Sequence, residues 1–218
     1  MSSVPAEISR NGKERHETMC GRFVIGGDFR EKLNELIMRE SIIPAELLYK
    51  ESGQDVFPSE SSAVIHSGDG RLSAGSMLWG FTNPYRKGLI INARAETVRE
   101  KKLFADSIMN RRCIVPASGF YEWNPDKARF CFTDPDDELL LLAGIYHEEQ
   151  GKPRYTILTT QANESMQPVH DRMPVLIRHD EIRSWIEDRE KLSEFLTRPQ
   201  MQLVCEQDSG QMRMDFGI

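Results

Sequence analysis

Cys20 is the residue whose type and position suggest the most specific chemistry in this sequence, because Met19 directly precedes it. If translation starts at Met19, removal of that residue leaves Cys20 with a free α-amine beside its thiol. An aldehyde forms an imine with such an amine, and the thiol then closes on the imine carbon to give a thiazolidine. An α-amine with a pKa of about 7.7 to 8.0 is partly neutral at pH 7, whereas an internal cysteine has only an amide nitrogen. The alternative is that Cys20 is a small buried hydrophobe in a strand.

A second candidate lies at Asn92 and Arg94, where an apolar run at 90–91 ends and a helix is expected to begin. The amide of Asn92 donates and accepts hydrogen bonds at once, and the planar fork of Arg94 suits a phosphate. The alternative is an ordinary turn at Asn92 followed by a solvated Arg94.

Glu122 stands among three aromatic residues, Phe120, Tyr121 and Trp123. On a strand Phe120 and Glu122 share one face, so apolar surroundings are expected to raise the pKa of the carboxyl and suit it to general acid catalysis. The alternative is an exposed Glu122 on a strand whose opposite face is aromatic core.

His170 and Arg172 belong to a polar cluster before Pro174 and an apolar strand. The imidazole of His170 suits proton transfer near neutral pH, and Arg172 suits phosphate binding. The alternative is that this histidine is structural, as most loop histidines are.

Short strands separated by turn residues dominate the sequence, and these elements must position the candidate side chains. We expect helices at 96–109, 180–185 and 191–196, and after Asp28, whose spacing to Glu31 is that of a capping box. The expected class is α+β, a single domain with a bent, barrel-like, mainly antiparallel sheet and a few short peripheral helices. The expected strands are 20–25, 63–66, 72–79, 89–91, 113–115, 120–123, 129–132, 139–146, 155–160, 175–177 and 201–205.

The 218 residues include 28 Lys and Arg against 34 Asp and Glu, a net charge of −6. This balance excludes a protein that coats nucleic acid along its whole surface. Residues 86–112 hold eight basic and three acidic residues, however, and this local charge of +5 favours a narrow basic cleft. The longest apolar run, 139–146, is far shorter than the roughly 20 residues of a membrane span, so no membrane association is expected.

The four cysteines are far apart and include no Cys-x-x-Cys pair, which argues against a disulfide framework or a structural metal; no metal or cofactor is expected. Residues 1–18 are polar and lack the apolar region of a secretion signal. We therefore expect a flexible N-terminal extension at 1–18, a domain at 19–218, and a monomer in the reducing cytoplasm.

Six segments, in order and spacing, resemble the SRAP family (SOS response-associated peptidase). The resemblance implies a role in the DNA damage response, in which SRAP proteins bind single-stranded DNA and capture abasic sites as a DNA–protein crosslink. It implies that Cys20 forms the crosslink, that Asn92 orients it, and that Glu122 and His170 are the acid–base pair. The six segments are Cys20–Phe23, Leu78–Phe81, Asn92–Thr97, Arg112–Ala117, Gly119–Trp123 and His170–Val175.

The same resemblance implies DNA contacts by Arg22, Trp79, Arg94 and Arg172. The sequence departs from the family at 55–60, where an Asn-x-Ala-Pro-x-Gln run is usual, and at 79–85, where a WGLxPxW-like run is usual. Two other functions stay open at this point. One is a cysteine-dependent peptidase or autopeptidase, with Cys20 as nucleophile and His170 and Glu122 as base and orienter. The other is a non-catalytic single-stranded DNA-binding module.

Overall fold

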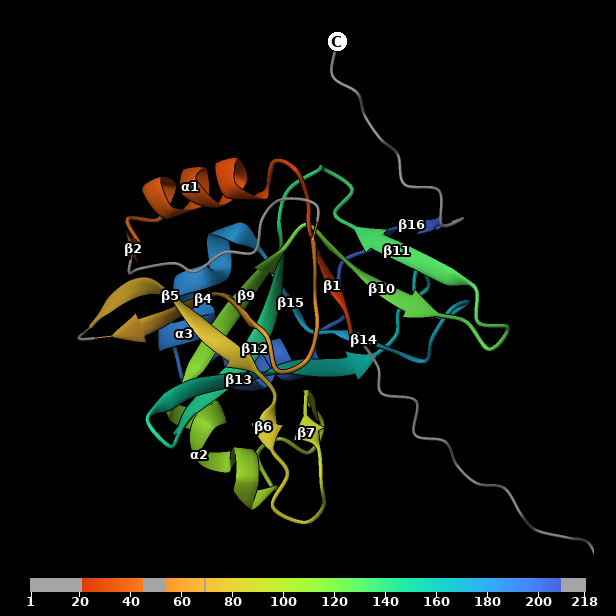
Figure 1. Cartoon of the computed structure of the whole chain (residues 1–218). Coiled ribbons are helices and arrows are strands. Elements are labelled where there is room, and N and C mark those ends of the chain that lie inside the picture. The colour runs from red at the N-terminus through yellow and green to blue at the C-terminus, as the bar shows by residue number, and fades with distance from the viewer. Residues whose placement is uncertain (1–20, 45–53, 69, 209–218) are drawn as a thin grey trace, which may run out of the picture.

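Five strands form a barrel at the centre of this computed structural model, which describes residues 21–44, 54–68 and 70–208 (Figure 1). Neighbouring strands pair antiparallel in the order β13–β12–β9–β4–β5. A parallel pairing of β5 with β13, at Leu78↔Arg154 and Trp79↔Tyr155, closes the barrel. The five strands are β4 (Ser61–Gly68), β5 (Arg71–Trp79), β9 (Arg112–Ala117), β12 (Leu140–Glu149) and β13 (Lys152–Gln161).

A second sheet of five antiparallel strands lies beside the barrel (Figure 1). On β10 the side chains alternate as expected for a strand with one covered face. Phe120 is buried and stacks on Phe132 with 5.2 Å between ring centroids, whereas Tyr121 and Trp123 are half-buried. The strands, in spatial order, are β16 (Val204–Gln207), β11 (Arg129–Thr133), β10 (Gly119–Trp123), β1 (Phe23–Ile25) and β3 (Gln54–Val56).

One core of buried apolar side chains extends through both sheets, which confirms the expected α+β class and single domain. Four short strands pair with strands of the barrel: β2 (Ile43–Pro44), β8 (Asn92–Arg94), β14 (Arg172–Pro174) and β15 (Leu176–Ile177). β6 (Phe81–Thr82) and β7 (Leu89–Ile90) pair with each other as a separate two-stranded sheet. Within the described residues no helix is long and apolar enough to cross a membrane.

The helices are short and peripheral: α1 (Phe29–Arg39), α2 (Lys102–Asn110), α3 (Ile182–Glu187) and α4 (Leu192–Thr197), with a 3-10 turn at His179–Glu181. Asp28 makes no side-chain cap; its carboxylate instead pairs with Lys32 at 2.8 Å, so the expected capping box is wrong. The helix expected from residue 96 begins only at Lys102. Residues 95–101 form turns instead, with a 3.1 Å hydrogen bond from the Thr97 amide to the Arg94 carbonyl.

Candidate active site

The end of β13 brings together two of the predicted segments. β8 pairs with it in parallel, with Asn92 opposite Ile157 and Arg94 opposite Thr159. β14 pairs on its other side, with Arg172 opposite Gln161. Residues 92–94 and 170–172 are far apart in sequence, and the fold places them on the two sides of one strand.

Arg172 is held by the protein itself. Its guanidinium forms a bidentate pair with Glu96, at 2.6 and 2.9 Å, and also donates to the Thr159 carbonyl at 2.7 Å. Burial opposes ionisation of Glu96, but the hydrogen bonds from Arg172 and the charges of Arg172 and Arg94 outweigh it and lower the pKa of the Glu96 carboxyl. A phosphate would reach Arg172 only by replacing Glu96, so the exposed Arg94 is the more accessible cation.

His170 is oriented by the backbone at the start of β14. Its Nδ1 accepts a 3.0 Å hydrogen bond from the Arg172 amide and also lies 3.0 Å from a carboxylate oxygen of Asp171. The amide bond fixes the ring, because the Asp171 side chain is 87% exposed and its charge is screened by water. In the neutral ring that hydrogen bond leaves Nε2 to carry the proton.

Glu122 is buried, at 4% exposure, on the inward face of β10 opposite Phe130 of β11. This confirms that the carboxyl lies on the apolar side of the strand, and it contradicts the alternative of an exposed Glu122. β10 pairs directly with β1, and the Tyr121 amide donates to the Arg22 carbonyl at 3.0 Å. The chain that precedes β1 therefore enters the structure beside Glu122; Cys20 itself lies outside the described residues.

Arg22 lies on the opposite, outward face of the same sheet. Its guanidinium carbon lies 4.6 Å from the ring centroid of Phe57 and 5.4 Å from that of Trp123. Its Nη1 pairs with Asp55 at 3.1 Å, and both side chains are about one-quarter exposed. Trp123 thus presents a half-buried ring next to a cation. It is not among the site residues predicted from the sequence, although its position next to Glu122 could have indicated it.

Trp79 is not at a surface, which corrects the expectation that it contacts DNA. Its side chain is completely buried, and its indole N–H donates to the Ile91 carbonyl at 3.1 Å. The ring packs against Phe23 of β1 at 5.2 Å and stacks on Tyr155 of β13 at 6.3 Å. Trp79 therefore connects β1, which leads to Cys20, with the residue before Asn92.

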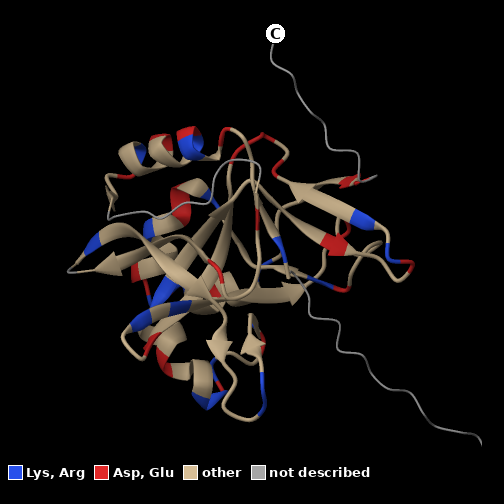
Figure 2. Cartoon of the chain, in the orientation of Figure 1, with Lys and Arg blue, Asp and Glu red and all other residues tan. Residues whose placement is uncertain are grey.

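The basic run at 86–112 does not form one continuous cleft. Arg112 is 3% exposed and donates to carbonyl groups, and Arg111 pairs with Asp106. The exposed cations of the run include Arg86 and Lys87 in the loop joining β6 to β7, and Figure 2 shows basic residues in this loop. These two cations follow Tyr85, which is 86% exposed. An exposed aromatic beside two cations is a suitable surface for a single strand of DNA.

The three described cysteines are poorly suited to nucleophilic chemistry. Burial raises the pKa of the Cys113 thiol far above its usual range. Burial, reinforced by the charges of Asp208, Glu206 and Asp55, raises the pKa of Cys131 to about 11, and burial also raises the pKa of Cys205. Among the described residues, no group of three or more His, Cys, Asp and Glu could hold a metal ion.

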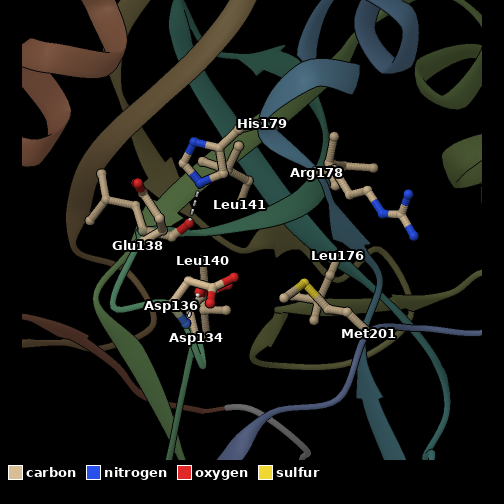
Figure 3. A pocket seen from close by; sticks show the side chains of 11 residues that line it. Asp134, Asp136, Glu138, Leu140, Leu141, Leu176, Arg178, His179 and Met201 are labelled. Atoms are coloured by element: carbon tan, nitrogen blue, oxygen red, sulfur yellow. Dashed lines mark hydrogen bonds between the residues drawn. The ribbon is translucent and has the colours of Figure 1, made fainter.

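A cavity of about 240 Å³ lies elsewhere, at the start of β12 (Figure 3). Leu140 and Leu176 contribute to its apolar lining, and Asp134 and Glu138 add carboxylates. His179, which also lines it, donates from Nε2 to the Leu139 carbonyl at 2.9 Å. None of the residues predicted for the active site lines this cavity.

The sequence of this chain is similar to that of a known protein family and of several named relatives. The sequence model of the family described as SOS response associated peptidase (SRAP) matches residues 19–212. The abasic site processing protein YoaM of Bacillus subtilis is 33% identical over 192 residues, which cover 82% of this chain and 83% of that protein. The abasic site processing protein YedK of Escherichia coli is 25% identical over 179 residues, covering 77% and 79%.

Solved structures share the fold. A crystal structure of a Bordetella bronchiseptica protein has a TM-score of 0.69 at 22% identity and covers 87% of this chain and 99% of that one. A Bacteroides thetaiotaomicron protein gives 0.66 at 20% identity, covering 86% and 91%.

Proposed function

The chain belongs to the SRAP family, and from that premise we propose that it binds single-stranded DNA and captures abasic sites covalently through the α-amine and thiol of Cys20. The relatives YoaM and YedK are named as abasic site processing proteins, which supports this substrate. The family match begins at Met19, which supports a functional chain that starts at Cys20 once that methionine is removed.

The observation that carries the proposal is the pairing of β1 with β10 beside a buried carboxyl. Cys20 is joined to Gly21 by one peptide bond, so the two Cα atoms are about 3.8 Å apart. Gly21 immediately precedes Arg22, whose carbonyl accepts from the Tyr121 amide, the neighbour of Glu122. A new α-amine at this position would lie within reach of the side of the sheet where the acid is.

The ring-opened abasic sugar supplies the aldehyde. The Cys20 amine adds to it and one water leaves, giving an imine; the thiol then adds across the C=N bond, with sulfur on carbon and the proton on nitrogen. Glu122 is the buried acid that gives a proton to the sugar ring oxygen during ring opening, and His170 transfers protons from Nε2 at imine formation. Asn92 orients the amine, and the exposed Arg94 holds a flanking phosphate.

The test uses protein that begins at Cys20, incubated with an oligonucleotide that carries one abasic site and analysed on a denaturing gel. We expect an adduct that Cys20→Ala abolishes as a stable product. Cys20→Ser keeps the amine and should give an imine that only borohydride makes stable. Protein that begins at Met1 should give no adduct, because its Cys20 nitrogen is an amide. An undiminished adduct in Cys20→Ala would overturn the proposal, and salt-sensitive binding without any adduct would indicate the non-catalytic binding module instead.

A further inference from the structure

Asp55 and Arg22 form an ion pair that competes directly with the DNA contact that the family resemblance implies for Arg22. Arg22 immediately precedes β1, and Asp55 lies on the adjacent strand β3, which pairs with β1 so that Asp55 is opposite Val24. Alternation along a strand gives Arg22 and Val24 the same face, and the Nη1 of Arg22 reaches Asp55 at 3.1 Å.

The aromatic rings fix the guanidinium without using its hydrogen-bond donors. Phe57, Trp123 and Tyr121 lie 4.6, 5.4 and 5.9 Å from its central carbon. Among the described residues, the buried Nε of Arg22 has no hydrogen-bond partner. The cation is thus held in place by ring contacts, and its charge is neutralised by one carboxylate.

The surroundings of Asp55 are acidic. On the same sheet, burial together with the charges of Asp55 and Asp208 raises the pKa of Tyr121, and Glu206 joins them in raising that of Cys131. The cation nearby on this face, Arg129, is itself paired with Asp208 at 2.7 Å. A phosphate that approaches Arg22 therefore meets a carboxylate already on the guanidinium and a second acid across the sheet.

We propose that Asp55 is an affinity-setting residue: its carboxylate occupies Arg22 until a DNA phosphate replaces it, and so it weakens the non-covalent binding of intact single strands. Carboxylate and phosphate bind a guanidinium through the same donors, so the two anions exclude each other. The inference rests on the proposed function. Its consequence is selectivity, because an intact strand depends on non-covalent affinity alone, whereas an abasic site is retained by the covalent bond to Cys20.

The test is Asp55→Asn, which keeps the shape and removes the charge, titrated with an intact single-stranded oligonucleotide by fluorescence anisotropy over a salt series. We expect affinity to rise about tenfold, equivalent to 1.4 kcal/mol. The slope of log affinity against log salt should steepen by about 0.7, the value for one more phosphate contact on a single strand. In an Arg22→Gln background Asp55→Asn should have little effect, because the two residues act as a pair.

The matched control is Asp106→Asn, which removes the same charge from another arginine pair, that of Asp106 with Arg111 on α2, and should change affinity less than twofold. If Asp55→Asn fails to fold, Asp55→Thr removes the charge with better strand propensity. Wild-type binding with no gain in either variant would overturn the inference and leave the proposed function standing. Absence of binding in both wild type and variants would overturn the two together.

Discussion

At the scale of single residues, Trp79 shows how a side chain that cannot touch DNA can still govern the site. Its indole links the barrel to β1 through Phe23 and to β8 through the Ile91 carbonyl. Trp79→Phe removes the indole donor from that buried carbonyl, which then keeps only the Ile157 amide as donor, and we expect the free energy of unfolding to fall by about 0.5 to 1.5 kcal/mol. Urea denaturation measures this loss. The rate of adduct formation should fall as well, while the affinity for intact single-stranded DNA stays within twofold.

Trp185→Phe is the matched control for this prediction. Trp185 is also completely buried, and its indole donates to the Cys113 carbonyl at 2.9 Å. It should lose similar stability without slowing adduct formation in the folded protein. A tenfold loss of affinity for intact DNA in folded Trp79→Phe would show instead that Trp79 contacts the strand.

At the scale of elements, Arg112 joins β9 to the ends of two helices. From β9 its guanidinium donates to the Trp185 carbonyl of α3 and to the Ile108 carbonyl of α2, the latter at 3.1 Å. Burial, with the charge of Arg189, lowers the pKa of Arg112 against the opposing charge of Asp188. Arg112→Met leaves several buried helix carbonyls unpaired. We therefore expect the free energy of unfolding, measured by urea denaturation, to fall by about 2 to 4 kcal/mol. Arg112→Lys should recover only part of this, because an ammonium lacks the planar fork; a variant Arg112→Met as stable as wild type would refute the role.

Strands with a periodic pattern of apolar residues were predictable from the sequence. Short strands that form only because they pair with a strand distant in the sequence were not. The long strands β4, β5, β12 and β13 appear where periodic apolar residues placed them. β8 and β14 have three residues each and exist because they flank β13, a pairing that no local pattern encodes. The same limit applies to the site. The burial of Glu122 followed from its immediate neighbours, whereas the Asp55–Arg22 pair and the buried position of Trp79 depend on contacts across the fold.

At the scale of the whole molecule, the net charge of −6 and the dispersed basic residues limit how strongly DNA is attracted. Arg22 and Arg172 are paired with carboxylates, and Arg112 is buried. The exposed cations proposed to contact DNA are Arg94 and, in the loop joining β6 to β7, Arg86 and Lys87. With about 0.7 per phosphate for a single strand, two or three contacts predict a salt slope of about −1.4 to −2.1.

This slope is measurable on intact single-stranded DNA by anisotropy between low and physiological salt. The double variant Arg86→Gln with Lys87→Gln should reduce its magnitude by up to about 1.4, because each lost phosphate contact removes about 0.7. Lys152→Gln with Arg183→Gln, the same charge change at exposed positions outside the loop, should leave the slope almost unchanged. A wild-type slope steeper than about −4 would require six or more phosphate contacts, twice the number proposed for Arg94, Arg86 and Lys87, and it would place the DNA across a larger surface.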